Sequence, residues 1–359
     1  MTANKHMLQT ILQAYGITGA ETTIEAFGNG LINHTWTVTS GQEECILQRI
    51  NHNIFKNPTA IAANISQIGN YLATHFPGYL FVKTIKTLEG GDMVFVKDEG
   101  YFRLFPFVKK SHTIDVVTSP EQAYEAAKQF GRFTKLLAAF PPEELQITLP
   151  DFHNLPLRYR QFETAINTGN KERVKQANEL ITFLRKQQAI VTTSESIPNN
   201  PAFKKRVTHH DTKISNVLFD NNDKGLCVID LDTVMPGYFI SDAGDMMRTY
   251  LSPVSEEEKD FDKIEIREDY FRAIAAGYLY EMKEELTSTE KEHFVYAGKF
   301  MIYMQALRFL TDYLNNDIYY GVKYEDQNLN RAKNQVVLLQ KIIDKSGYLN
   351  SIISGMGGK

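Results

Sequence analysis

The sequence has few cysteines, no excess of charge of one sign and no long apolar run. Only two cysteines, Cys45 and Cys227, occur among its 359 residues, and both lie in apolar stretches. We therefore expect buried, reduced thiols rather than a disulfide, and two cysteines are too few for metal-thiolate sites. The 39 basic and 43 acidic side chains leave a formal charge of −4. Because that charge is small, it provides no overall field for holding nucleic acid or an anionic membrane.

Targeting and membrane-spanning patterns are also missing. Residues 1–7 are polar and lack the apolar core of a signal peptide. No stretch approaches the roughly 18 consecutive apolar residues of a transmembrane helix. Even the apolar run Phe294–Leu310 carries Lys299, Gln305 and Arg308. The sequence thus predicts a soluble, cytoplasmic protein that acts away from membranes.

The composition is that of an ordinary globular protein, with 43% apolar and 23% charged residues. At roughly 150 residues per domain, the length predicts about two domains or lobes. Up to about residue 106, the pattern predicts strands around glycine-rich turns, together with two helices. The expected strands are 22–27, 35–39, 45–50, 79–88, 93–97 and 101–108, and the expected helices are 6–15 and 58–75.

From Pro120 onward the pattern changes to long helices, interrupted by a β-rich island at 217–232. The expected helices are 120–139, 155–168, 171–190, 267–283, 289–314 and 328–346. This change predicts an α+β protein with a β-rich N-terminal lobe, residues 1–106, and a helix-rich C-terminal lobe, residues 107–359.

One polar segment and the hairpin behind it carry the strongest indication of chemistry. The residues concerned are Asp211, Lys213, Asn216, Asp230 and Asp232. A five-residue turn after residue 220 would pair 217 with 229 and set Asn216 opposite Asp230, with Cβ atoms about 5 Å apart. An amide oxygen and a carboxylate there suit Mg²⁺, and Asp232 shares the face of Asp230 as a second carboxylate ligand.

The spacing within this segment fits phosphoryl transfer. Asp211 lies five positions before Asn216, so it can contact a hydroxyl nucleophile while Asn216 holds the metal. Phosphoryl transfer needs one carboxylate to orient the hydroxyl and accept its proton, and other groups to hold Mg²⁺ on the phosphates. Lys213 would place a cation near the transferring phosphoryl group. The alternative is a set of ordinary polar residues that cap a hairpin.

This segment is similar to the catalytic and metal loops of the aminoglycoside phosphotransferase and choline kinase family. The resemblance implies the two-lobed protein-kinase-like fold, with ATP in the cleft between the lobes. It implies that Asp211 is the catalytic base and that Asn216 and Asp230 are Mg²⁺ ligands. It also implies that His209 braces the loop and takes no part in proton transfer.

The N-terminal lobe supplies candidates for nucleotide binding. Gly28, Gly30 and Asn33 belong to a glycine-rich turn, where backbone amides can approach ATP phosphates without an intervening Cβ, although such a turn can also be purely structural. In the next strand the family usually supplies a cation for the phosphates. Strand alternation puts Leu47 and Arg49 on one face, which predicts adenine contact for Leu47 and phosphate contact for Arg49. A plain surface cation is the alternative for Arg49.

Two further features complete the expected ATP site. The helix that usually supplies an acidic partner for the phosphate-binding cation has no Asp or Glu between residues 59 and 74, which leaves Asn64 as the candidate partner. At the junction of the lobes, Phe105, Phe107 and Val108 are expected either to sandwich adenine or to fill the core.

Several stretches resemble one branch of the family, the N-acetylhexosamine 1-kinases, which phosphorylate the anomeric hydroxyl of N-acetylglucosamine and N-acetylgalactosamine. These stretches are Gly28–Asn33, Ile46–Asn51, Ile229–Gly237, Leu307–Leu314 and Asp317–Tyr320. The branch resemblance implies a small-molecule sugar substrate. The alternatives are the same transfer to choline, an aminoglycoside, homoserine or a methylthio-sugar, and a catalytically inactive nucleotide-binding regulatory protein.

Arg308 and Tyr319 are the candidate sugar contacts. Arg308 lies among apolar neighbours in a helix, where an unpaired cation is costly, so a sugar hydroxyl or N-acetyl carbonyl is a suitable acceptor. Tyr319 would add a stacking face and a hydroxyl. The alternative for Arg308 is an ion pair with Asp312, one helical turn further on.

Overall fold

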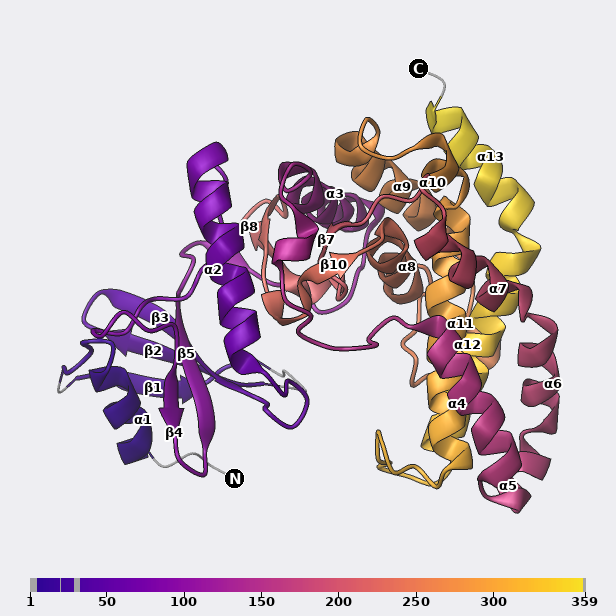
Figure 1. The fold of residues 1–359 in the computed structure, drawn as a ribbon, viewed down its shortest axis with the longest axis horizontal. Coiled ribbons are helices and arrows are strands. Elements are labelled where there is room, and N and C mark those ends of the chain that lie inside the picture. The colour runs from indigo at the N-terminus through magenta and orange to yellow at the C-terminus, as the bar shows by residue number, and fades with distance from the viewer. Residues whose placement is uncertain (1–4, 20, 29–32, 358–359) are drawn as a thin grey trace.

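The computed structural model describes residues 5–19, 21–28 and 33–357, which form two lobes that lie side by side (Figure 1). The N-terminal lobe is built on an antiparallel sheet with the strand order β1-β2-β3-β5-β4. Its strands are β1 (Thr23–Ala26), β2 (His34–Ser40), β3 (Glu43–Ile50), β4 (Val94–Val96) and β5 (Gly100–Pro106), and its helices are α1 (Lys5–Gln13) and α2 (Pro58–His75).

The two faces of this sheet have different neighbours. Helix α1 covers one face, where Leu8 and Ile11 pack against Leu47 and Phe102 in a small separate core. Helix α2 lies between the sheet and the C-terminal lobe (Figure 1), and its apolar residues join the large core of that lobe. The face opposite α1 is therefore the one that looks toward the rest of the molecule.

The C-terminal lobe is mainly helical. Its helices are α3 (Pro120–Leu136), α4 (Leu155–Thr168), α5 (Lys171–Gln176), α6 (Asn178–Lys186), α7 (Ala189–Ser196), α8 (Phe239–Tyr250), α9 (Glu268–Met282), α10 (Ser288–Glu292), α11 (Phe294–Leu314), α12 (Gln327–Asp344) and α13 (Ser346–Gly357). Helix α11 runs through the lobe and packs against α4, α8 and α12. The α+β, two-lobed architecture predicted from the sequence is confirmed.

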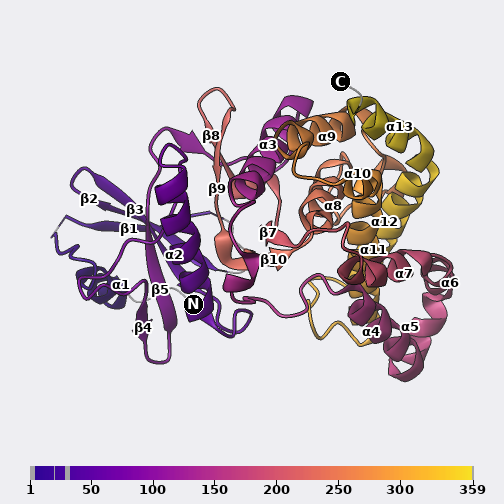
Figure 2. The ribbon, with the colours of Figure 1, turned by 45° about the horizontal axis from the view of Figure 1, so that its top comes forward.

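Two small sheets lie where the lobes meet. One pairs β7 (Arg206–Thr208) with β10 (Met235–Gly237), and the other has the order β6 (Ser111–His112), β8 (Val217–Asp220), β9 (Gly225–Val228). Figure 2 shows the β8–β9 hairpin between α2 of the N-terminal lobe and α3. The polar segment that the sequence analysis singled out thus lies beside the junction of the two lobes.

Several long helices begin at signals that the sequence displays. Asn57, Ser119 and Asn154 each cap a helix by accepting a hydrogen bond from a backbone N–H in its first turn. A proline occupies one of the first two positions of each of these helices, where its missing N–H costs nothing. The structure confirms the helices predicted at 58–75 and 155–168. Their caps and prolines explain why they begin at these residues.

Some predicted elements are wrong. Residues 79–88 form no ladder; only Ile85 bridges to Leu104, because β4 occupies most of that edge of β5. The helix expected at 171–190 is divided among α5, α6 and the start of α7, with a break at Ala177. The helix expected at 289–314 breaks at His293, whose ring nitrogen Nδ1 bonds back to the Thr289 carbonyl.

Helix α8 was missed altogether. Ten of its residues are buried, among them the polar residues Ser241, Asp242 and Asp245. None of the helices in the described part of the chain is both long and apolar enough to cross a membrane.

Candidate active site

The loop that follows β7 brings three of the predicted residues together. Asn216 Nδ2 donates to the Asp211 carbonyl at 2.9 Å and to Asp211 Oδ2 at 3.1 Å. Lys213 Nζ lies 3.1 Å from the same Oδ2. Burial pushes the pKa of Lys213 down, but the carboxylates of Asp211 and Asp245 outweigh it, so the pKa is raised and the lysine stays charged. The Asp211 side chain retains 20% of its exposure, which leaves it accessible to a substrate hydroxyl.

Buried carboxylates on helix α8 accept hydrogen bonds from the backbone of this loop. Asp242 accepts hydrogen bonds from the backbone N–H groups of His209 (3.0 Å) and His210 (2.7 Å). Asp245 accepts from Thr212 N at 2.9 Å, and the Tyr250 hydroxyl donates to the Thr212 carbonyl at 2.6 Å. The sequence analysis missed these residues. Their signal was the presence of two acidic residues inside an otherwise apolar stretch, where a carboxylate needs partners.

His209 has the bracing role that the resemblance implied. Its Nε2 lies 2.9 Å from the Ile229 carbonyl, which requires the proton on Nε2. Its ring stands edge-on to Phe130 at 5.1 Å, and burial lowers its pKa, so the imidazole is neutral. His209 therefore ties the loop to the end of strand β9.

The predicted register of the β8–β9 hairpin is wrong by one residue. Val217 pairs with Val228, not with residue 229, and the ladder shifts again after Leu218. The Asp220 carboxylate closes a tighter turn than expected by accepting from the N–H groups of Asn222 and Lys224. As a result Asn216 meets Ile229 through its carbonyl (2.9 Å) and is not opposed to Asp230.

Of the three predicted metal ligands, Asp230 interacts electrostatically with Asp232 and with Asp211, the partner of Asn216. Asp230 has a left-handed backbone (φ +58°), which takes it out of the strand. Its side chain is exposed to solvent, yet surrounding protein raises its pKa, and the charges of Asp232 and Asp211 raise it further. Asn216 uses its amide nitrogen for Asp211, so its amide oxygen is free to act as a ligand.

Asp232 joins the lobes. Its Oδ2 accepts from Asn33 Nδ2 at 2.9 Å, and its Oδ1 lies 2.6 Å from Arg103 Nη2 in an ion pair whose two side chains are each 2% exposed. Despite this ion pair, Asp232 Oδ1 accepts no hydrogen bond of good geometry, and Arg103 Nη1 donates none. Buried polar atoms without a hydrogen bond are rare in native proteins, and a functional role is one explanation for them.

The nucleotide contacts predicted on β3 are wrong for a common reason. Leu47 is fully buried in the small core under α1, so it has no surface to offer adenine. Arg49 lies on the same face and pairs with Glu99 at 3.0 Å. Asn64 does not pair with it; Asn64 exchanges hydrogen bonds with Gln146 and donates to the Val234 carbonyl. Alternation was predicted correctly, but α1 covers the face that was assigned to the nucleotide.

The opposite face of the sheet carries another cation, Arg103. Arg103 on β5 donates to Gln48 Oε1 from Nε (2.9 Å) and from Nη2, and its guanidinium lies 5.0 Å from the ring of Phe105. Phe105, Phe107 and Val108 are partly exposed at the end of β5. Their contact with adenine stays a prediction.

The glycine-rich turn is described only in part. Gly28 has a φ of +72°, a conformation that disfavours a side chain, while Gly30 lies outside the described residues. Asn33, where the description resumes, accepts from Asn51 N at 2.9 Å and donates to Asp232. The end of the turn is therefore hydrogen-bonded directly to the Asp232 carboxylate.

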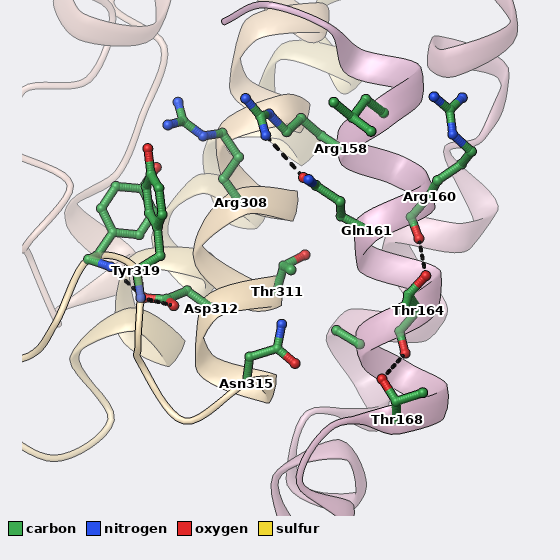
Figure 3. A pocket seen from close by; sticks show the side chains of 13 residues that line it. Arg158, Arg160, Gln161, Thr164, Thr168, Arg308, Thr311, Asp312, Asn315 and Tyr319 are labelled. Carbon is green, nitrogen blue, oxygen red and sulfur yellow. Dashed lines mark hydrogen bonds between the residues drawn. The ribbon is translucent and has the colours of Figure 1, made fainter. Parts of the chain in front are cut away.

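A pocket of about 530 Å³ lies between α4 and α11. Arg308 and Tyr319 both line it, together with Arg158 and Gln161 (Figure 3). Arg308 does not pair with Asp312, which instead accepts from the backbone N–H groups of Tyr319 and Tyr320 and from Asn328. The ion pair considered as the alternative for Arg308 is thus contradicted.

Two histidines connect this pocket to the catalytic loop. His153 Nδ1 lies 3.3 Å from Nδ1 of His210, the residue before Asp211. Burial lowers the pKa of His153 well below its usual value, and His210, Arg308, Arg248 and Arg158 lower it further. The charges of Arg308 and Arg158 therefore act on the residue that contacts His210.

Comparison with known proteins agrees with this geometry. The family described as "Phosphotransferase enzyme family" matches residues 23–281. A microcompartment-associated aminopropanol kinase is similar over 97% of this chain and 99% of its own, with a TM-score of 0.64 and 13% identity. An amicoumacin kinase in complex with AMP-PNP and Ca²⁺ is similar over 96% of this chain and 94% of its own, with a TM-score of 0.62 and 15% identity. A choline kinase from Cryptosporidium parvum Iowa II is similar over 98% of this chain and 100% of its own, with a TM-score of 0.59 and 14% identity.

Proposed function

Because the chain belongs to the phosphotransferase enzyme family, we propose that it is an ATP-dependent kinase that phosphorylates the anomeric hydroxyl of an N-acetylhexosamine. The observation that carries the proposal is the cluster of Asp211, Lys213 and Asn216 beside Asp230 and Asp232. This cluster combines an accessible carboxylate, a neighbouring cation and further oxygen atoms that suit a metal ion.

Asp211 is the general base in this proposal. Its carboxylate accepts the proton of the C1 hydroxyl as that oxygen attacks the γ-phosphorus of ATP. The new bond joins the C1 oxygen to phosphorus, and the bond between the γ-phosphorus and the β,γ-bridging oxygen breaks to release ADP. An anomeric hydroxyl has a lower pKa than an ordinary alcohol, which eases this step. Lys213 offsets the negative charge beside Asp211.

The donor set fits Mg²⁺. A bound Mg²⁺ would supply positive charge that neutralises the nucleotide phosphates. Asn216, Asp230 and Asp232 would hold it, and all three offer oxygen atoms, with Asp232 Oδ1 lacking a hydrogen bond. Among the described residues, no three His, Cys, Asp or Glu side chains are arranged to hold a metal by themselves. Bound Mg²⁺ would therefore rely also on the Asn216 amide and on nucleotide phosphates.

Arg103 is the proposed phosphate-binding cation in place of Arg49. It faces away from α1, and its Nη1 is buried without a partner. The turn containing Gly28, Gly30 and Asn33 would lie over the phosphates. Phe105, Phe107 and Val108 are the proposed adenine contacts.

Arg308 and Tyr319 are the proposed sugar contacts. Arg308 has no carboxylate partner among the described residues and contacts only Gln305 Oε1 (3.3 Å) and the ring of Tyr320. Its N–H groups are available to a sugar hydroxyl or an N-acetyl carbonyl. The cationic lining of this pocket disfavours choline and aminoglycosides as acceptors.

The direct test is the structure of the product. The protein would be incubated with ATP, Mg²⁺ and either N-acetylglucosamine or N-acetylgalactosamine, and the product examined by ³¹P and ¹H NMR. We expect a phosphate coupled to the anomeric proton. Phosphorylation at another hydroxyl, or turnover only with an unrelated acceptor, would contradict the sugar assignment and leave the kinase assignment standing.

A further inference from the structure

The pocket between α4 and α11 carries two arginines without carboxylate partners. Arg158 donates from Nη2 to the Asp151 carbonyl (2.8 Å) and from Nη1 to Gln161 (3.0 Å), both neutral acceptors. Arg308 likewise has only Gln305 as a hydrogen-bond acceptor. Ion pairs neutralise most of the well-buried arginines of the described chain, such as Arg206 with Glu290 and Arg248 with Asp245. The two pocket arginines, which are partly buried, lack such an ion pair.

The acidic residue in the pocket lining makes no ion pair with either arginine. Asp312 lines the same pocket, but its two oxygens are occupied by the N–H groups of Tyr319 and Tyr320 and by the Asn328 amide. These hydrogen bonds hold the loop after α11 in place, so the Asp312 carboxylate has a structural role. Among the described residues, neither arginine forms an ion pair with a carboxylate, although the charge of Asp151 acts on Arg158.

Polar atoms without partners line the same space. Arg158 Nε and the Thr311 hydroxyl are both buried and make no hydrogen bond. Burial lowers the pKa of Arg158, and the charge of Arg308 lowers it further, which shows that the two guanidinium groups repel each other. In Figure 3 both guanidinium groups lie on the same side of the pocket, near Gln161.

An oxyanion satisfies each of these features. It would neutralise the two charges and accept N–H bonds in the fork geometry that a guanidinium presents. We infer that Arg158 and Arg308 form a binding site for an oxyanion, so that the preferred acceptor carries a carboxylate or phosphate away from the hydroxyl that is phosphorylated. This inference rests on the proposed kinase activity and narrows its substrate class from neutral to anionic N-acetylhexosamines.

Kinetic selectivity tests the inference. ADP release would be measured at fixed Mg·ATP with N-acetylglucosamine, its 6-phosphate and its 6-carboxylate (the uronic acid). We expect kcat/KM for at least one anionic sugar to exceed that for the neutral sugar by about tenfold or more, because charged hydrogen bonds contribute about 1.5–3 kcal/mol. In Arg158→Gln and Arg308→Gln this ratio should fall at least about tenfold.

Arg160→Gln is the matched control. Arg160 is on the same helix and also belongs to the pocket lining, but it is exposed, and in Figure 3 its side chain points to the side of α4 away from Arg158 and Arg308. Its replacement removes the same charge and should leave the selectivity ratio unchanged. Equal losses in Arg158→Gln and Arg160→Gln, or a wild-type preference for the neutral sugar, would overturn the inference.

Binding without ATP separates this inference from the proposed function. Calorimetric titration with N-acetylglucosamine 6-phosphate, the uronic acid and inorganic phosphate needs no turnover. Tighter binding of either anionic sugar than of N-acetylglucosamine, lost in Arg158→Gln, supports the site even if no acceptor is phosphorylated. Binding of inorganic phosphate alone, or equal affinity for charged and neutral sugars, would refute it even if the protein is an active kinase.

Discussion

At the scale of single residues, Asp211 is held by groups that leave its carboxylate reachable. Asn216 and Lys213 fix Oδ2, and Asp242 fixes the backbone just before it. The sequence alone predicts Asp211, Lys213 and Asn216 as a group, because they lie close together in the chain. The partners on α8 are 30 or more positions away and are set by packing.

Replacing Asp211 by Asn removes the proton acceptor but keeps a hydrogen-bond acceptor for Asn216. A positioned general base typically contributes about 10²–10⁴-fold, so we expect kcat to fall by about that factor. Thermal stability and the affinity for ATP should change little, because the side chain is partly exposed. Turnover at the wild-type rate, measured by ADP release, would show that Asp211 is not the base.

The two candidate phosphate cations give a sharper residue-scale prediction. Arg103→Gln leaves Asp232 as a buried carboxylate without its ion pair, a change that typically costs about 3–5 kcal/mol, and should raise the KM for ATP at least about tenfold. Arg49→Gln breaks an exposed pair with Glu99 and should cost no more than about 1 kcal/mol, with little effect on that KM. Urea denaturation would measure the stability of both variants, and kinetic titrations with ATP would measure their KM. A larger rise of the KM in Arg49→Gln than in Arg103→Gln would identify Arg49 as the phosphate-binding cation.

At the scale of elements, the sequence predicted those helices and strands that display a local signal. Capped helices such as α2 and α4 were found, while α8, which begins without a side-chain cap, was missed. Turn chemistry explains the register error after β8, since the Asp220 carboxylate closes the turn in a way that strand alternation does not reveal.

Helix α8 also makes a pH-dependent contribution to stability through Asp242. Burial raises the pKa of this carboxyl to about 7, although the His209 and His210 N–H groups oppose the shift. Since the unfolded value is about 4, the folded state holds the proton more tightly. Asp242 therefore stabilises the fold fully only below about pH 4, and that contribution is lost as the pH rises to about 7.

Asp242→Asn should remove this dependence and one of the two loop hydrogen bonds. We expect the stability of the wild type relative to the variant, from urea denaturation, to decrease between about pH 4 and pH 7 and then level off. A difference that is constant over that range would show that Asp242 is ionised throughout. In either case the variant should turn over more slowly, because the catalytic backbone loses a fixed point.

At the scale of the whole molecule, the lobes meet through Asp232, whose partners Asn33 and Arg103 come from the other lobe. A ligand at this junction binds only the assembled protein, so it adds to the free energy of unfolding. At 100 times its Kd, Mg·ATP should contribute about 2.7 kcal/mol, a rise of a few degrees in Tm.

The matched comparison is ATP with EDTA, which should give a smaller shift because the charges of Asp230 and Asp232 then face the phosphates without a cation. A Tm that does not respond to Mg·ATP would contradict nucleotide binding. A shift without turnover on any acceptor would favour the inactive regulatory protein considered above.

The sequence by itself determined the division into a β-rich and a helix-rich lobe and the local polar segment with Asp211, Lys213 and Asn216. Both depend on residues close together in the chain, where periodicity, caps and spacing act directly. Tertiary structure alone decided which face of β3 looks toward the C-terminal lobe, that Arg103 and not Arg49 reaches Asp232, and that Asp312 is unavailable to Arg308. Those choices follow from α1 covering one sheet face and from the loop after α11 claiming a carboxylate, and neither contact leaves a local trace in the sequence.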